Sequence, residues 1–186
     1  MAGRRRPSFI AVVGSKKTGK TTLATFLVHR LVRKGYSVAS IKHVHHRGFS
    51  MDTPGTDSWR LAKAGSRTVV VISPDEMAQT TRLGQRLQLF PMAVKAALGI
   101  RPDVIVIEGF ASMLHSFSNP LAIIVMARDE DDLLRSLNRV PRSVVAISGS
   151  IAETTSKTGH NGIPILKYPT DRERLLRAIS KSLRLT

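Results

Sequence analysis

Runs of consecutive apolar residues are the feature of this sequence that most restricts its fold. They lie at residues 9–13, 38–41, 67–73, 103–109, 121–127, 143–148 and 163–166. Strands that are apolar throughout are typical of a parallel sheet that is covered on both faces. Helical patterns occupy residues 21–34, 87–99, 129–138 and 171–185. This alternation implies right-handed strand–helix–strand crossovers, so we expect an α/β fold, a three-layer and mostly parallel sheet with helices on both faces.

Length and composition limit the possible organisation of the chain. Its 186 residues predict one domain over 9–186, preceded by a flexible basic segment over 1–8. Cysteine is absent, which excludes disulfides and thiolate metal sites. The basic start is not followed by a secretion pattern, and no apolar run approaches the roughly 20 residues of a membrane span. We therefore expect a cytoplasmic protein that does not enter a membrane.

The net charge is unusually positive. Lysine and arginine total 29 against 13 acidic residues, which gives a formal charge of +16. Such a field attracts polyanions, including nucleotides and nucleic acids. The basic residues are scattered, however, and none of the basic segments is interleaved with aromatic side chains as a base-stacking surface would be. A generally basic surface is the simpler interpretation, and a nucleic-acid partner is not expected.

The stretch from Gly14 to Thr21 has the spacing G-x-x-x-x-G-K-T of a phosphate-binding P-loop. In such a loop the glycines, here Gly14 and Gly19, let backbone N–H groups point at phosphate oxygens. Lys20 would neutralise the outer phosphates, and Thr21 would offer its hydroxyl to Mg²⁺. An apolar run precedes the motif and a helical pattern follows it, as a P-loop requires. A glycine-rich turn with surface lysines is the alternative. The motif predicts a P-loop NTPase-like fold.

A P-loop also predicts an acidic residue at the end of a neighbouring strand, where it helps to organise Mg²⁺. Glu108 follows the apolar residues 104–107 and precedes Gly109. We predict that Glu108 binds Mg²⁺, directly or through water. A solvated turn residue is the alternative.

A histidine cluster follows the second apolar run. The sequence KHVHH places His43, His45 and His46 close together. This is the edge at which open α/β sheets bind ligands, so contact with phosphate or another anion is the favoured interpretation. A transition-metal site and a solvated loop are the alternatives. Asp52 and Asp57, further along the same polar stretch, are candidates for orienting water or Mg²⁺.

Four motifs together carry a family resemblance. They are GSKKTGKTT at 14–22, KHVHH at 42–46, DTPGTDSWRLAKAG at 52–65 and DVIVIEGF at 103–110. In this order and spacing they resemble the molybdopterin-guanine dinucleotide biosynthesis protein B family, MobB, from about Phe9 to Arg128 and more loosely beyond. The resemblance implies a protein that binds GTP and Mg²⁺, hydrolyses GTP weakly and forms a homodimer. It also implies a partner, the guanylyltransferase that attaches GMP to molybdopterin.

Carried over by position, the resemblance assigns a site. It implies nucleotide contacts at Gly14, Ser15, Lys16, Lys17, Thr18, Gly19, Lys20, Thr21, Thr22, His43, His45, His46, Glu108 and Gly109. Thr21 and Glu108 would bind the metal, and Asp57 with Lys20 would act in catalysis. The chain lacks the N-K-x-D motif that reads guanine, so GTP over ATP rests on the family, and residues 148–157 are where base contacts are expected.

Two other functions share the P-loop. A small-metabolite kinase typically carries an arginine-rich lid, and residues 135–142 could form one. A non-catalytic binding module switched by nucleotide would need the loop but no turnover.

Overall fold

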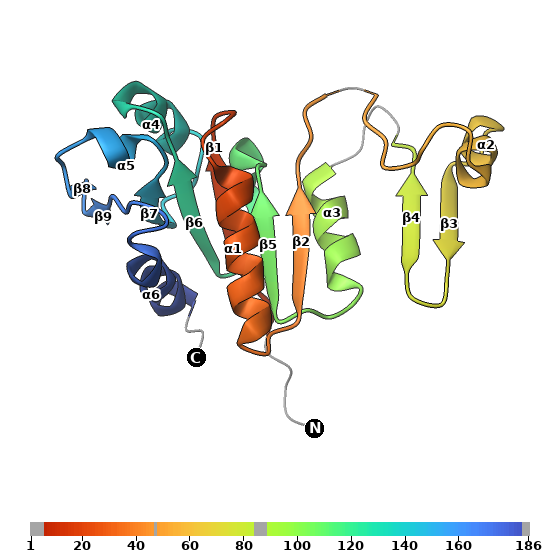
Figure 1. The fold of residues 1–186 in the computed structure, drawn as a ribbon, viewed down its shortest axis with the longest axis horizontal. Helices are drawn as coiled ribbons and strands as arrows, with labels where there is room; N and C mark the ends of the chain where they lie inside the picture. The colour runs from red at the N-terminus through yellow and green to blue at the C-terminus, as the bar shows by residue number, and fades with distance from the viewer. Residues whose placement is uncertain (1–5, 47, 84–88, 184–186) are drawn as a thin grey trace. The chain divides into compact units, whose positions relative to one another are not determined.

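The computed structural model describes residues 6–46, 48–83 and 89–183, and its chain divides into two compact units. The larger unit comprises residues 1–43 and 90–186, and the smaller unit comprises residues 44–89. Figure 1 shows the helices and strands of both units. The single domain predicted for 9–186 and the flexible segment predicted for 1–8 stay predictions, and residues 1–5 lie outside the described part of the chain.

A parallel five-stranded sheet forms the framework of the larger unit. Its strand order is β2 (Val38–Lys42), β5 (Val104–Glu108), β1 (Ser8–Gly14), β6 (Leu121–Met126) and β7 (Val144–Ser148). In the register Val12 pairs with Glu108, Lys42 pairs with Glu108 and Gly14 pairs with Met126. The ends of four strands therefore meet at one edge, the carboxyl edge of the sheet.

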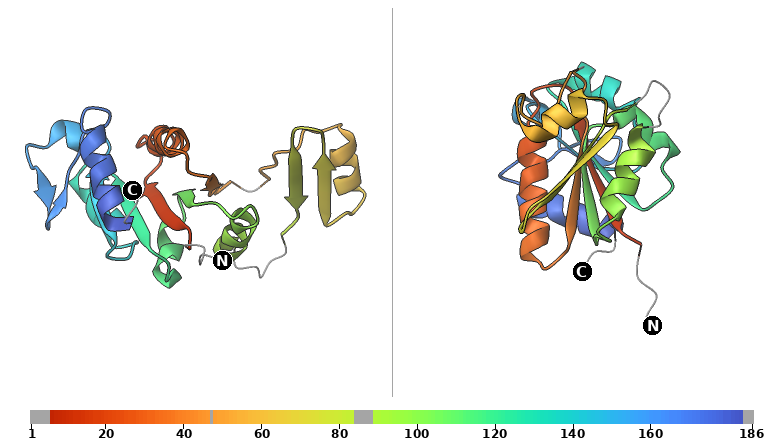
Figure 2. Two further views of the ribbon diagram at one scale, coloured as in Figure 1. Left: turned by 90° about the horizontal axis from the view of Figure 1, so that it is seen from below. Right: turned by 90° about the vertical axis from the view of Figure 1, so that its right-hand side faces the viewer.

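Helices cover both faces of this sheet, because successive strand residues point to opposite sides. Ile10 and Val12 pack with α1 (Lys20–Arg33) and α6 (Arg172–Leu183). Phe9, Ala11 and Val13 belong to a second core. That core includes residues of α3 (Leu89–Leu98), the 3₁₀ helix η1 (Ala111–Ser116), α4 (Glu130–Leu137) and α5 (Ile151–Thr154). Figure 2 shows α1 and α6 on one side of the sheet and α3 on the other. The predicted three-layer α/β fold is confirmed.

A short antiparallel pair, β8 (Gly159–His160) and β9 (Ile163–Pro164), follows α5. The predicted last strand over 163–166 is therefore shorter than expected. Residue Ile165 still makes one parallel bridge to Ile147 in β7, so this segment extends along the edge of the main sheet.

The smaller unit consists of α2 (Asp57–Lys63), β3 (Thr68–Ile72) and β4 (Met77–Thr81). Strands β3 and β4 form an antiparallel hairpin that is not part of the five-stranded sheet. The prediction that residues 67–73 belong to the parallel sheet is therefore wrong. An apolar, β-branched run favours a strand but does not specify its partner, and Val70, Val71 and Ile72 remain exposed. The polar sequence of β4 carried no comparable signal.

Within the described ranges, none of the helices combines the length and apolarity needed to cross a bilayer.

Candidate functional site

The loop between β1 and α1 depends on its two motif glycines. Gly14 has φ 140°, and a Cβ built there would lie 1.9 Å from the carbonyl oxygen of Met126. Gly19 has φ 83° and occupies the position before the first turn of α1. Lys17 also lies in the left-handed region, with φ 61°. The tight path that a phosphate-binding loop requires is thus present, and Gly14 allows β1 to pass directly beside β6.

Ser15 is the centre of the hydrogen bonds inside this loop. Its carbonyl oxygen accepts from the Thr18 hydroxyl, at 2.9 Å, and from the Lys20 ammonium. Its own hydroxyl donates to a carboxylate oxygen of Asp132 in α4. Thr18 is buried. The loop is therefore held in shape by its own residues and by one side chain from a distant helix.

Burial lowers the pKa of the Lys20 ammonium. The carboxylate of Glu108 opposes this effect, the neighbouring ammonium of Lys42 adds to it, and the carboxylate of Asp132 opposes it. The net shift is downward. Lys20 thus lies near two carboxylates and a second lysine, a cluster of four charges whose formal charges cancel.

The predicted metal ligands lie side by side. The Thr21 hydroxyl donates to Glu108 Oε1 at 2.9 Å, and the Glu108 side chain is only 15% exposed. Lys42 Nζ lies 3.0 Å from Glu108 Oε2 and 3.3 Å from Thr21 Oγ1. A carboxylate and a hydroxyl are hard oxygen donors of the kind that Mg²⁺ prefers, so these two residues fit the ion. Their role as ligands stays a prediction.

Strand alternation separates Lys42 from His43. The backbone N–H of His43 donates to the carbonyl oxygen of Glu108 at 2.9 Å, so the residue continues β2 along β5. Its ring stacks on Phe110, with centroids 4.3 Å apart, whereas the Lys42 side chain reaches Thr21. His43 therefore lies at the carboxyl edge but packs against the opposite core.

At Gly109 the backbone also passes close to a neighbouring residue, here His43. Gly109 has φ 95°, and a Cβ built there would lie 3.0 Å from His43 Cβ. Its N–H donates to the carbonyl oxygen of Val12 at 3.0 Å. Gly109, a predicted nucleotide contact, thus lies beside the site, and its backbone N–H is bonded to β1.

His45, His46 and Asp57 belong to the smaller unit and are exposed. In the parts of the chain that the structure describes, no three residues of the histidine, cysteine, aspartate or glutamate type gather as a metal site. Asp57 begins α2 with a 97% exposed side chain. Asp52 instead accepts hydrogen bonds from the hydroxyls of Thr56 and Ser58, so its carboxylate is already bonded to residues at the start of α2.

Asp132 was not predicted as a site residue. It is 1% exposed and accepts from Ser15, from the Arg128 backbone at 3.1 Å and from Arg128 Nε at 3.3 Å. Burial alone would raise the pKa of this carboxyl, but the hydrogen bonds from Ser15 and Arg128 outweigh it and lower the pKa. The D-x-x-D spacing with Asp129, whose side chain caps α4, was the available sequence signal. That spacing indicates a helix start and says nothing of the P-loop.

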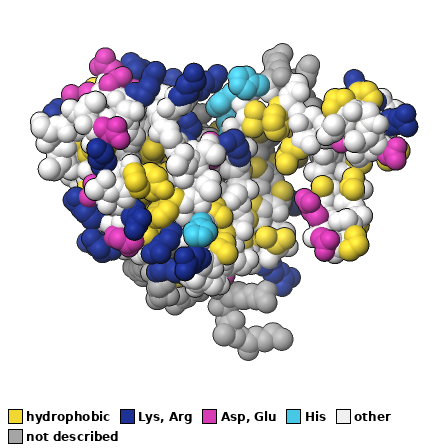
Figure 3. All heavy atoms as spheres, in the orientation of Figure 1, with side chains coloured by type: hydrophobic (Ala, Val, Ile, Leu, Met, Phe, Trp, Pro, Cys, Tyr) yellow, Lys and Arg dark blue, Asp and Glu magenta, His cyan; other side chains and the backbone are white. Residues whose placement is uncertain are grey.

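Lys16, Lys17 and Thr22 are exposed on the loop and the first turn of α1. Figure 3 shows lysine and arginine side chains gathered along the edge of the larger unit near α1 and α4. The predicted phosphate-binding surface is therefore open and basic.

Residues 148–157, where base contacts are expected, connect β7 to β8 at the same edge. Gly149 has φ 97°, and a Cβ there would lie 2.5 Å from the carbonyl oxygen of Ala127. Lys157 Nζ lies 2.5 Å from Glu130 Oε1 at the start of α4. Base recognition by this segment stays a prediction.

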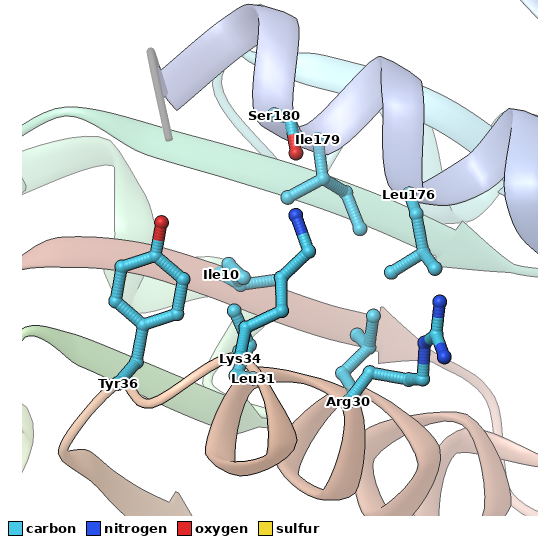
Figure 4. Close-up of a pocket in the computed structure, with 9 residues that line it drawn as sticks. Ile10, Arg30, Leu31, Lys34, Tyr36, Leu176, Ile179 and Ser180 are labelled. Atoms are coloured by element: carbon cyan, nitrogen blue, oxygen red, sulfur yellow. The ribbon is translucent and has the colours of Figure 1, made fainter. Parts of the chain in front are cut away.

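The larger unit contains cavities of different sizes, and one of about 270 Å³, lined by α3 together with Ser116 and Phe117, includes no residue of the phosphate loop. A cleft of about 290 Å³ lies between α1 and β2, and Thr21, Lys42 and Glu108 form one end of it. A third cavity, between α1 and α6, has a volume of about 30 Å³, with Leu31 and Ile179 in its wall (Figure 4). Because 30 Å³ holds about two water molecules, this third cavity is too small for a nucleotide. The carboxyl edge is the candidate site.

Comparison with known proteins gives consistent results. The family model described as molybdopterin guanine dinucleotide synthesis protein B matches residues 9–147. The molybdopterin-guanine dinucleotide biosynthesis adapter protein of Escherichia coli (strain K12) is 30% identical over 152 residues, which cover 81% of this chain and 83% of that protein. The Haemophilus influenzae adapter protein is 28% identical, covering 75% and 72%.

Solved structures agree at the level of the fold. The crystal structure of Bacillus subtilis MobB superposes with a TM-score of 0.67 at 23% identity, covering 92% of this chain and 97% of that one. The MobB homolog from Bacillus stearothermophilus gives 0.66 at 19% identity, covering 95% and 99%. Because the family model spans most of the sequence, P-loop and Glu108 included, the chain belongs to the molybdopterin guanine dinucleotide synthesis protein B family.

Proposed function

We propose that this protein binds GTP with Mg²⁺ at the carboxyl edge of its sheet and acts as an adapter in molybdopterin-guanine dinucleotide biosynthesis. The observation that carries the proposal is the contact between Thr21 and Glu108, directly after the tight glycine loop. Residues from two separate motifs would thus supply the oxygens of one magnesium site beside one phosphate loop. The names of the relatives supply the biosynthetic role.

The loop residues would bind the phosphates. The N–H groups of residues 15–20 and the positive N-terminal end of α1 attract phosphate oxygens, and Lys20 adds a full positive charge. Bound Mg²⁺ would neutralise further charge on the outer phosphates. Guanine as the base follows from the family.

We propose slow hydrolysis, with Lys20 stabilising charge on the transferring oxygens and Asp57 orienting the attacking water. The Asp57 carboxylate is 97% exposed with only a loose 3.8 Å ion pair to Arg60, whereas Asp52 accepts hydrogen bonds from Thr56 and Ser58. This difference supports Asp57 as the water-orienting residue.

We propose that the partners are the molybdopterin guanylyltransferase and a second copy of this chain, in the cytoplasm. The exposed apolar residues of the β3–β4 hairpin, among them Val70, Ile72 and Met77, are the surface we assign to the second copy. Apolar side chains of this size that gather on one hairpin typically mark an interaction surface.

Titration calorimetry with GTP and ATP tests nucleotide binding. We expect binding of GTP that Lys20→Ala abolishes, while Lys95→Ala, an exposed lysine of α3, leaves it within about twofold. Retained GTP affinity in Lys20→Ala would contradict the proposal. Preferential binding of ATP would contradict guanine recognition.

Labelled GTP separates the three candidate functions. Release of inorganic phosphate supports the GTPase, transfer of label to a metabolite supports a kinase, and tight binding without turnover supports a binding module. Co-purification of the guanylyltransferase with the wild-type chain tests the adapter role. Failure to bind it in the presence of GTP and Mg²⁺ would contradict that role.

A further inference from the structure

The Lys42 ammonium contacts an oxygen of each residue that would bind the metal, Glu108 and Thr21. The ammonium is 3.0 Å from Glu108 Oε2 and 3.3 Å from Thr21 Oγ1. The sheet determines this position, because Lys42 and Glu108 are direct partners in the β2–β5 register and their side chains point to the same face. The contact therefore follows from the backbone and from the alternation of the strands.

The Lys42 ammonium compensates a carboxylate that is largely removed from water. Glu108 is 15% exposed, and its other oxygen accepts only a neutral hydroxyl from Thr21 among the hydrogen bonds described. A largely buried carboxylate without a counter-charge is unfavourable. In the metal-free protein Lys42 thus makes the ion pair with Glu108 that a divalent cation would otherwise replace, and the Lys20 ammonium adds a further positive charge nearby.

The side chains of Lys42 and Glu108 differ in how far they can move. The Lys42 side chain is 54% exposed on a flexible four-carbon stem, whereas Glu108 is held at the end of a central strand. An ammonium and a divalent cation on the same oxygens would repel each other. Lys42 can move into solvent, and Glu108 cannot follow it.

We propose that Lys42 is a displaceable internal cation, which occupies the magnesium position in the metal-free protein and must leave when a divalent ion binds. This inference rests on the proposed nucleotide–magnesium site. It makes Lys42 a positioning residue that sets the affinity for the metal, so that divalent ions bind firmly only when a nucleotide adds its own oxygens.

Mn²⁺ binding to the nucleotide-free, full-length chain tests the proposal, with electron paramagnetic resonance reporting the free ion. We expect Lys42→Gln to tighten Mn²⁺ binding by about threefold to tenfold, the equivalent of one partly exposed ion pair. Lys42→Arg keeps the charge and should stay within about twofold of wild type. Lys95→Gln removes the same charge far from Glu108 and should also stay within about twofold. Glu108→Gln should abolish the binding.

A second measurement separates this role from direct phosphate binding. In the presence of EDTA, the GTP affinity of Lys42→Gln should stay within about threefold of wild type, because Lys42 would act on the phosphates only as a nearby, partly exposed charge. Loss of GTP affinity in EDTA would make Lys42 a phosphate ligand and overturn the inference. Unchanged or weaker Mn²⁺ binding in Lys42→Gln would also overturn it, while leaving the proposed function intact if wild type binds GTP with Mg²⁺. Wild-type protein that binds neither GTP nor Mn²⁺ would overturn both.

Discussion

At the scale of single residues, Asp132 connects two parts of the chain that share no local sequence pattern. Its carboxylate joins the Ser15 hydroxyl of the phosphate loop to the backbone and side chain of Arg128. A buried carboxylate of this kind is stable because several donors replace its water. The conformation of the loop therefore depends on a residue of α4.

We predict that Asp132→Asn lowers the free energy of unfolding by about 1–3 kcal/mol, because an amide cannot accept from Ser15 and Arg128 as the carboxylate does. Urea denaturation at neutral pH measures the change. Asp131→Asn is the matched control, since Asp131 is the exposed neighbour in the same helix turn, and it should have an effect below about 0.5 kcal/mol. Equal effects of the two substitutions would contradict a special role for Asp132.

The loss of stability caused by Asp132→Asn should depend on pH in a definite direction. The pKa of Asp132 in the folded protein lies below its ordinary value of 3.8. The contribution of the Asp132 carboxylate to the free energy of unfolding is therefore complete above the pKa that Asp132 has in the unfolded chain. It is lost as pH falls through the lower pKa of the folded state. The difference in unfolding free energy between wild type and Asp132→Asn should be constant near neutral pH and shrink in acid. A difference that grows in acid would show that the assigned hydrogen bonds are wrong.

At the scale of elements, the β1–α1 junction combines close packing with an unusual backbone. Gly14 lets β1 pass beside the carbonyl of Met126, where a Cβ would lie 1.9 Å away. Gly35, which ends the turn after α1, also has a positive φ but has open space around it. Comparison of the two glycines separates steric overlap from backbone strain.

We predict that Gly14→Ala destabilises the protein by about 3 kcal/mol or more, and that Gly35→Ala costs only the left-handed strain of about 1–2 kcal/mol. Gly14→Ala should also abolish GTP binding, because the loop cannot keep its path. Thermal unfolding and calorimetry measure both effects. Wild-type stability of Gly14→Ala would refute the close approach between β1 and β6.

At the scale of the whole molecule, the chain presents apolar side chains on a hairpin outside its main sheet. Ile72 and Met77 are cross-strand partners, 74% and 68% exposed. Apolar side chains that are exposed next to one another mark an interaction surface more often than scattered ones do. They are the strongest physical support for the proposed second copy.

We predict that Ile72→Lys shifts the protein from dimer to monomer, because a charge at the apolar interface would have to be desolvated. Sedimentation velocity measures the mass. Val32→Lys, on the exposed side of α1, introduces the same charge at a 54% exposed position and should leave the dimer intact. A wild-type monomer, or a dimer that survives Ile72→Lys, would contradict the assigned surface.

Local patterns in the sequence were sufficient to predict most of the fold and, within the site, the phosphate loop and Glu108. Apolar runs and helical periodicity depend on neighbouring residues, so the strands of the main sheet, the helices α1, α3, α4 and α6 and the phosphate loop were predictable, whereas the short helices η1 and α5 were not. The pairing of Thr21 with Glu108 followed because the strands of a parallel sheet bring their carboxyl ends to one edge. Sequence patterns also predicted β3 as a strand, but not its partner.

Only the tertiary structure decided which distant side chains share the site. Asp132 lies 117 positions after Ser15, and Lys42 lies 66 positions before Glu108. Their contacts arise from strand order, register and helix placement, which join segments that have no local pattern in common. The sequence therefore determined the phosphate loop, and the arrangement of the sheet determined the charges that surround it.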